Sequence, residues 1–177
     1  MTMPPRLRKF ALTLHVTSSV GLLGAIGAFL ALAIAGPTSQ NVQVAQVVYP
    51  AMQLVARYVI VPLTFASLLT GLVQSLATPW GLFRHYWILI KLLLTAFATT
   101  VLLLKISLID GAARLAAETV LPRADLRQAG IQLAAHAAGG LLVLFVPVVL
   151  SIYKPPGTTR YGWRKQLQLR SDHVANR

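Results

Sequence analysis

The chain has 177 residues, of which 56% are hydrophobic and 11% are charged. Because soluble domains usually carry about 25% charged residues, this composition excludes an ordinary soluble fold and predicts one compact membrane domain. The net charge of +12 would favour nucleic-acid binding in a soluble protein. Here the basic residues lie mainly outside the apolar runs, which is typical of topology signals and of contacts with anionic lipid head groups. We therefore expect the lipid bilayer as a partner, and no nucleic acid.

The N-terminal part predicts a short cytoplasmic tail followed by the first membrane span. Residues 1–9 carry three basic residues and two prolines. Residues 10–35 are apolar, and roughly 20 such residues cross a bilayer. A cleavable signal peptide would start in the same way, but its apolar core runs only about 7–15 residues. We expect this stretch to remain as a span that ends near Gly36 and Pro37.

The next apolar region is too long for one upright span, and Arg57 divides it. Residues 58–78 are long enough to form the second span alone. Residues 47–57 are therefore expected to form a helical extension at the outer interface. Pro50 and Pro62 each lack a backbone donor and are expected to bend this region.

Residues 78–87 predict a tight turn at the bilayer surface. This stretch combines a Pro-Trp-Gly sequence with four aromatic residues, Arg84 and His85. Proline fixes its own φ angle and glycine frees the next position, so the chain can reverse direction here. Tryptophan and tyrosine prefer the boundary between membrane and water. The turn should therefore join the second span to the third.

The remaining sequence predicts two more spans and a second tail. Residues 86–108 form the third span, and residues 110–121 form a short outer interfacial helix stopped by Pro122. Residues 130–153 form the fourth span, and residues 154–177 form a basic tail. Lysine and arginine concentrate in both tails and in the turn before the third span, so both termini should be cytoplasmic. The predicted fold is all-α, a polytopic membrane protein with four transmembrane helices in an antiparallel bundle.

Small residues recur on one face of the first predicted span. They let helix backbones approach closely, so they predict helix–helix packing within the bundle, with a second copy of the chain or with a membrane partner protein. We assign the same packing role to two glycines of the fourth span. The full set is Gly21, Gly24, Ala28, Ala31, Gly139 and Gly140.

Polar residues line one face of the second span and one face of the fourth. Polar groups in hydrocarbon are costly unless paired, so both faces should point into the bundle. Interhelical hydrogen bonds would satisfy them, for example between His136 and Ser67 or Thr64, and so would a shared polar cavity. The candidate cavity residues are Arg57, Thr64, Ser67, Gln74, Gln132 and His136.

The basic residues Arg84, Lys91 and Lys105, in and just before the third span, are separated by seven or fourteen residues. They therefore lie on nearly the same face of one helix. Lys91 and Lys105 lie near opposite ends, and we expect both side chains to snorkel to the membrane surfaces. A sharper hypothesis is a site for an anion or a lipid head group at the inner end. Its residues would be Arg84, His85 and Lys91.

The sequence excludes several chemistries. It contains no cysteine, no Walker loop, no HExxH and no GxSxG pattern, and all its acidic residues lie outside the predicted spans. Bis-histidine haem ligation needs two histidines at one depth on facing helices. Only His15 and His85 share a depth, near water, whereas His136 has glycines beside it but no partner at its depth. We therefore expect no catalytic residue, no metal and no cofactor.

Two pairs of segments resemble a group of uncharacterised bacterial four-helix integral membrane proteins. The first pair is Leu68-Leu69-Thr70-Gly71-Leu72 and Thr78-Pro79-Trp80-Gly81-Leu82-Phe83-Arg84-His85-Tyr86-Trp87, and the second is His136-Ala137-Ala138-Gly139-Gly140 and Leu150-Ser151-Ile152-Tyr153-Lys154-Pro155. The resemblance implies a multi-pass protein of a bacterial cytoplasmic membrane and implies no activity. In layout alone, the chain is similar to copper-resistance membrane proteins and b-type cytochromes.

Three hypotheses of function follow. The first is a non-enzymatic structural or accessory subunit that uses the packing faces. The second is binding or transport of an uncharged or anionic small molecule between the second and fourth spans. The third is a b-type haem protein.

Overall fold

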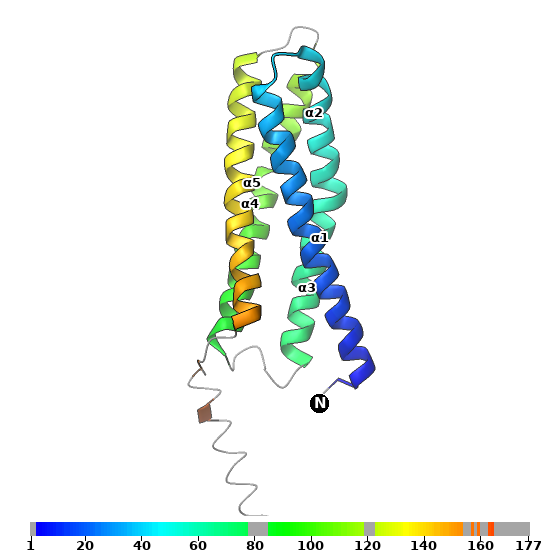
Figure 1. Ribbon diagram of the computed structural model, residues 1–177, viewed down its shortest axis with the longest axis vertical. Coiled ribbons are helices and arrows are strands. Elements are labelled where there is room, and N and C mark those ends of the chain that lie inside the picture. The colour runs from blue at the N-terminus through cyan, green and yellow to red at the C-terminus, as the bar shows by residue number, and fades with distance from the viewer. Residues whose placement is uncertain are drawn as a thin grey trace, which may run out of the picture.

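The computed structural model describes residues 3–77, 85–118 and 123–153, together with residues 157, 159, 163 and 164. This part of the chain is all-α and forms a long antiparallel bundle (Figure 1). We call the end at which the first helix begins the lower end, and the opposite end the upper end. The elements are α1 (Pro5–Thr38), α2 (Val42–Val55), the π-helix η1 (Ala56–Ile60), α3 (Val61–Ala77), α4 (Tyr86–Ala116) and α5 (Arg123–Tyr153).

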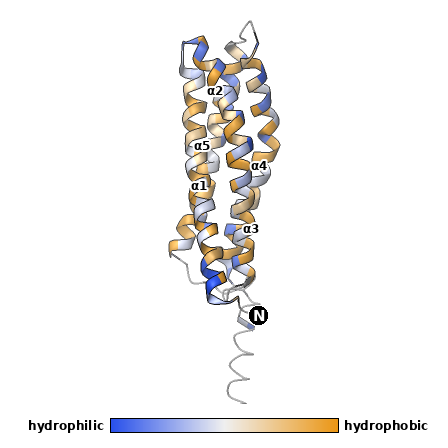
Figure 2. Ribbon diagram, turned by 90° about the vertical axis from the view of Figure 1, so that its right-hand side faces the viewer, coloured by the Kyte–Doolittle hydropathy of each residue, from blue (hydrophilic) through white to orange (hydrophobic). Residues whose placement is uncertain are grey.

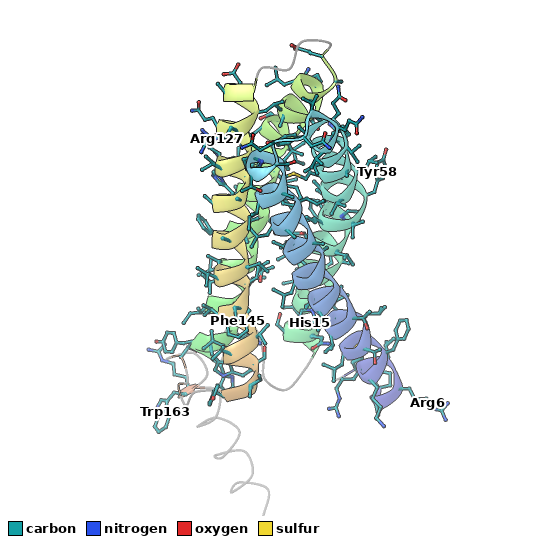
Figure 3. All side chains as sticks on the ribbon, turned by 45° about the horizontal axis from the view of Figure 1, so that its top comes forward. Arg6, His15, Tyr58, Arg127, Phe145 and Trp163 are labelled. Carbon is teal, nitrogen blue, oxygen red and sulfur yellow. The ribbon has the colours of Figure 1, made fainter. Side chains whose placement is uncertain are left out.

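Four helical stretches of the described residues are long and apolar enough to cross a membrane, so the prediction of four such helices is confirmed. Hydrophobic residues run along the length of the bundle, as Figure 2 shows. Large side chains such as those of Tyr58 and Phe145 are exposed and point away from it (Figure 3). A monomeric soluble protein rarely exposes an apolar surface of this extent, and the architecture is consistent with a multi-pass membrane protein.

The second stretch continues without a break through Arg57, where the sequence predicts a division. Pro62 explains the local geometry, because it cannot donate to the carbonyl of Tyr58 and its ring would clash with that group in an α-helix. The π-helix η1 widens the turn just before Pro62, and the N–H of Val61 donates to the carbonyl of Ala56. The helix therefore accommodates the proline by a local change of winding.

Helix α4 also extends further than predicted. The sequence predicts a span that ends at residue 108 and a separate interfacial helix over residues 110–121, but α4 is continuous to Ala116. Asp110 is the first acidic residue after the predicted span. Its charge is neutralised from a neighbouring helix, so the backbone can remain helical through it.

Asp110 receives hydrogen bonds from two side chains of the α2–η1 segment. Gln53 Nε2 donates to its Oδ1 atom at 2.8 Å. Arg57 Nε donates to the same oxygen at 3.2 Å, and Arg57 Nη2 pairs with Oδ2. This bidentate ion pair fixes the position of α4 against the π-helix.

The apolar core occupies the upper part of the bundle. Its largest fully buried side chains are those of Tyr49, Met52 and Leu133. The buried cluster draws on α1, α2, η1, α4 and α5. Its members are Leu22, Phe29, Ala33, Val48, Tyr49, Met52, Ala56, Ile60, Ile109, Ala112, Ala116, Leu126, Ala129, Leu133 and Ala137.

Tyr49 joins three helices within this core. Its hydroxyl donates to the carbonyl of Leu126 at 2.6 Å. Two glycines make room for the ring, since a Cβ atom at Gly36 would lie 3.0 Å from it and one at Gly130 would lie 2.7 Å from the hydroxyl. Gly130 is four residues after Leu126, so its missing side chain also uncovers the accepting carbonyl.

Gly130→Ala is expected to destabilise the bundle. The added methyl group would lie 2.7 Å from the Tyr49 hydroxyl and 2.9 Å from Pro37 Cδ, and the hydrogen bond it displaces is worth about 1 kcal/mol. Gly111→Ala is the matched control, because a Cβ there has no neighbour within 4 Å. Alanine should stabilise that helix by up to about 1 kcal/mol. Thermal unfolding midpoints in detergent should move in opposite directions, and midpoints that move together would contradict the packing described.

Arg57→Met and Asp110→Leu are each expected to lower the unfolding midpoint, because each leaves one charge without its partner. The double variant removes both charges and should lose less stability than the two single variants combined. The measurement is a double-mutant cycle of thermal unfolding in detergent. Strictly additive losses would show that the pair does not hold α4 to the π-helix.

Candidate functional site

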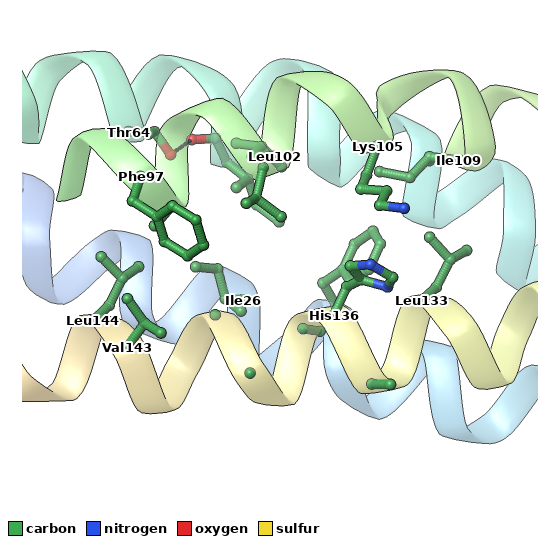
Figure 4. Close-up of a pocket in the computed structure, with 18 of the residues that line it drawn as sticks. Ile26, Thr64, Phe97, Leu102, Lys105, Ile109, Leu133, His136, Val143 and Leu144 are labelled. Atoms are coloured by element: carbon green, nitrogen blue, oxygen red, sulfur yellow. Dashed lines mark hydrogen bonds between the residues drawn. The ribbon is translucent and has the colours of Figure 1, made fainter. Parts of the chain in front are cut away.

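A cavity of about 380 Å³ lies inside the bundle, at the lower edge of the core. Residues of α1, η1, α3, α4 and α5 line it (Figure 4). Most of the lining is apolar and comes from long side chains on the facing sides of these helices. Examples are Ile26, Phe29, Phe97, Leu102, Val143 and Leu144.

The cavity exists because α5 carries small residues where it faces α4. A Cβ atom added at Gly139 or at Gly140 would have no neighbour within 4 Å, and both glycines line the cavity. The sequence predicts that these glycines bring helices into close contact. In the structure they instead leave space between helices, since the side chains opposite them do not fill the gap.

Lys105 and His136 are the polar groups at one end of the cavity. Lys105 reaches in from α4 and His136 from α5, as Figure 4 shows. Both side chains are half-buried. The sequence predicts that Lys105 snorkels to the membrane surface, whereas its side chain here lines the cavity. Thr95, Ala98 and Lys105 share one face of α4, and all three line the cavity.

The ring of His136 is held by its own helix. Its Nδ1 atom lies 2.6 Å from the carbonyl oxygen of Gln132. A carbonyl can only accept, so Nδ1 carries the hydrogen. In the neutral ring, Nε2 is then left with a lone pair that can accept a hydrogen bond. The predicted hydrogen bond from His136 to Ser67 or Thr64 is therefore replaced by a local one.

The two threonines of the lining are also satisfied by their own helices. Thr64 donates to the carbonyl of Ile60 at 2.7 Å, and Thr95 donates to the carbonyl of Lys91 at 2.9 Å. Their hydroxyls thus present only acceptor positions to the cavity. The polar character of the site is concentrated at the end that holds Lys105 and His136.

The six residues of the predicted polar cavity do not all line one cavity in the structure. Thr64 and His136 line the cavity that is present. Arg57 pairs with Asp110 at the side of the bundle, and Gln132 is exposed. Among the described residues, the buried Nε2 atom of Gln74 has no hydrogen-bond partner.

The lower half of α3 uses its polar face against α1. Ser67 lies 2.8 Å from Ser19, oxygen to oxygen. His15 Nδ1 lies 3.1 Å from the carbonyl oxygen of Ser67 and 3.1 Å from Thr70 Oγ1. Gly71 permits this approach, since a Cβ there would lie 3.0 Å from the His15 ring. The hydrogen-bonding groups on the polar face of the second span are therefore partly paired with side chains of α1.

The small-residue face of α1 points outward. Its four predicted packing residues Gly21, Gly24, Ala28 and Ala31 are all exposed. A Cβ at Gly24 would have no neighbour within 4 Å, and one at Gly21 would reach only Leu63, at 3.5 Å. The opposite face, with Leu22 and Phe29, enters the core. Packing of this face inside the bundle is thus limited to the contact of Gly21, and its packing against another chain stays a prediction.

The predicted anion site at the lower end is described only in part, since Arg84 lies outside the described residues. Lys91 Nζ lies 4.5 Å above the ring of Trp87 and donates to Ser151 Oγ at 3.2 Å. The rings of His85 and Trp87 are 6.0 Å apart, centre to centre. Lys91 is therefore held between α4 and α5, and binding of an anion there stays a prediction.

The described residues contain no group of three or more histidine, aspartate or glutamate side chains that could hold a metal ion. The chain matches no protein-family model, no curated protein and no solved structure. The resemblance to bacterial four-helix membrane proteins receives no support from these comparisons.

Proposed function

We propose that this protein is a non-enzymatic membrane protein that binds one small, largely apolar molecule in the cavity inside its bundle. The observation that carries the proposal is the cavity of about 380 Å³, whose lining is mostly apolar, with Lys105 and His136 at one end and two threonine side chains elsewhere. Small-molecule sites in proteins have volumes of roughly 300–1,000 Å³ and combine a mostly apolar wall with a few convergent polar groups. The space between α4 and α5 has both properties.

The cavity also makes an occupant favourable on energetic grounds. Side chains that face an unfilled space lose dispersion contacts that a packed interior would supply. In well-packed proteins, this loss is roughly 24 cal/mol for each Å³ of cavity. A molecule that fills the space between Gly140 and the side chains of α4 recovers part of that loss, and this favours binding of an apolar ligand.

A second candidate function, a structural or accessory subunit, is favoured by the outward face of α1. This face is made of small residues that the bundle leaves largely uncovered, including Gly24 and Ala28. Helices in membranes associate through such faces. A second copy of the chain or a membrane partner would pack there without disturbing the cavity.

We also propose a location in a bacterial cytoplasmic membrane, with both termini in the cytoplasm and with anionic lipid head groups as partners. Arg6, Arg8 and Lys9 precede the apolar part of α1 at the lower end of the bundle. Helix α5 ends at the same end, at Tyr153 (Figure 1), and the basic residues 154–177 follow it in the sequence. The positive-inside rule supports a cytoplasmic lower end.

Photolabelling tests the proposed binding. The protein in lipid nanodiscs is irradiated with a diazirine-bearing dodecanol, and labelled peptides are mapped by mass spectrometry. Labels are expected on cavity residues such as Leu102 and Val143, and Gly140→Leu should remove most of them by filling the space. Gly27→Leu is the matched control, since it also adds a side chain where no atom lies within 4 Å but does not line the cavity.

Lipid-facing residues provide an internal reference for this experiment. Leu104 and Leu142 are 71% and 72% exposed and should be labelled equally in all variants. Labelling confined to such residues in the wild type would rule out the proposed site. So would cavity labelling that Gly140→Leu leaves unchanged.

Cysteine labelling tests the proposed orientation in the membrane. Because the chain contains no cysteine, an introduced thiol is the only one that can react with the maleimide. Gln43→Cys introduces an exposed thiol at the upper end and Arg6→Cys one at the lower end. In bacterial spheroplasts, a membrane-impermeant maleimide should label Gln43→Cys, and should label Arg6→Cys only after the membrane is permeabilised. The reverse pattern would overturn the proposed topology.

A further inference from the structure

We propose that the ligand of the cavity is a single-chain amphiphile with a carboxylate head group, bound by Lys105 and His136. This inference rests on the proposed function and adds the chemical class of the ligand. Three features of the cavity support it: the positive charge of Lys105, the hydrogen-bonding capacity of His136 and the mostly apolar remainder of the lining.

The two polar residues reach the same depth of the bundle from neighbouring helices. At a rise of 1.5 Å per residue, Lys105 lies about 16 Å below the upper end of α4, which is at Ala116. His136 lies about 20 Å below the upper end of α5, which is at Arg123. Figure 4 shows both side chains at one end of the cavity, with Phe97 and Leu144 at the other. A ligand that fills the cavity therefore places its head near Lys105 and His136.

Lys105 brings a positive charge into an apolar site. Among the described residues, it makes no hydrogen bond and no ion pair, and no acidic residue lines the cavity. Asp110, five residues further along α4, is engaged by Arg57 and Gln53. A charge in such surroundings is stabilised strongly by an opposite charge. An anionic head group would supply that charge.

His136 adds a second contact for the same head group. Because Nδ1–H donates to Gln132, the neutral ring presents the Nε2 lone pair, and the protonated ring presents an N–H there. An ionised carboxylate accepts from Lys105 with one oxygen, and its other oxygen accepts from Nε2–H when the ring is protonated. A protonated carboxyl group would instead donate to the lone pair of the neutral ring, but it would carry no charge opposite to that of Lys105. An alcohol can form similar hydrogen bonds but cannot compensate the charge of Lys105.

Away from Lys105 and His136, the side chains that line the cavity offer a ligand no hydrogen-bond donor. Thr64 and Thr95 donate to their own helices, so neither offers a hydrogen to a ligand. Phe97 lines the cavity and is also 59% exposed, so the wall at that end borders the lipid. An apolar chain can extend in this direction from a head group held at the other end.

Competition between two ligands of equal chain length tests the inference. Dodecanoate and dodecan-1-ol each compete with the diazirine-bearing dodecanol for the cavity of the full chain in nanodiscs. The measurement is made at about pH 9, where a carboxylic acid is ionised. In the wild type, dodecanoate is expected to compete about tenfold better than the alcohol, the scale of a hydrogen bond to a charged group.

Three variants locate the source of this preference. Lys105→Met removes the charge and should reduce the preference to about twofold or less, whereas Lys105→Arg keeps the charge and should retain it. Lys91→Met is the matched control, because Lys91 contacts Trp87 and Ser151 and does not line the cavity. The ratio of the two competitors is compared between variants, so their partitioning into the lipid cancels.

The outcomes separate this inference from the proposed function. Equal competition by both ligands in the wild type would overturn the carboxylate assignment and leave the apolar site intact. A preference that survives Lys105→Met would overturn the role of Lys105. If Lys105→Met does not fold, Lys105→Gln replaces it. The preference for dodecanoate should then be present in the wild type and in Lys105→Arg and lost in Lys105→Gln. A preference that survives Lys105→Gln would overturn the role of Lys105. Absence of cavity labelling in the wild type would overturn the proposed function itself.

Discussion

The hydrogen bond from Tyr49 to the carbonyl of Leu126 is the contact on which the upper part of the bundle depends. It joins residues 77 positions apart in the chain. The ring fits only because Gly36 of α1 and Gly130 of α5 lack side chains at the point of closest approach. One aromatic side chain thereby sets the spacing of three helices. The Arg57–Asp110 ion pair adds α4 to this arrangement, so all four candidate spans are fixed near the upper end.

The cavity is a consequence of where this packing stops. Close contact at the upper end brings α1, α2 and α5 together through alanine, glycine and one tyrosine. Further down, α5 continues with Gly139 and Gly140, but no large side chain from a neighbouring helix fills the space beside them. Residues of the same small type thus have opposite effects at two levels of one helix. The difference lies in the side chain opposite the glycine.

Local hydrogen bonds explain why the threonine hydroxyls of the lining are not available as donors inside the cavity. Hydroxyl groups in apolar surroundings donate to the carbonyls of their own helices, as Thr64 does, and this removes them as donors. Ser67 instead has a partner on α1. Lys105 cannot be satisfied in this local way, because an ammonium group has three donors and a charge. Among the charged and hydroxyl side chains that line the cavity, Lys105 is therefore the one without a partner among the described residues, and the proposed ligand supplies that partner.

The number and apolar character of the membrane-length helices could be predicted from the sequence, because spans must satisfy their backbone internally and cover about 30 Å of hydrocarbon. Their ends could not, since α4 continues to Ala116 and the second stretch continues through Arg57. The candidate cavity residues chosen from the sequence include Thr64 and His136, which line the cavity. The two glycines of the fourth span were predicted to pack against a helix, and they leave space instead. Which face of α1 points inward depends on tertiary packing alone. In a membrane, the lipid and the core are both apolar, so hydrophobicity does not distinguish the outer face of α1, with Gly24, from its inner face, with Phe29. For the same reason, the sequence could not show that Lys105 lines a cavity, since a snorkelling lysine and a ligand-binding lysine have the same local pattern.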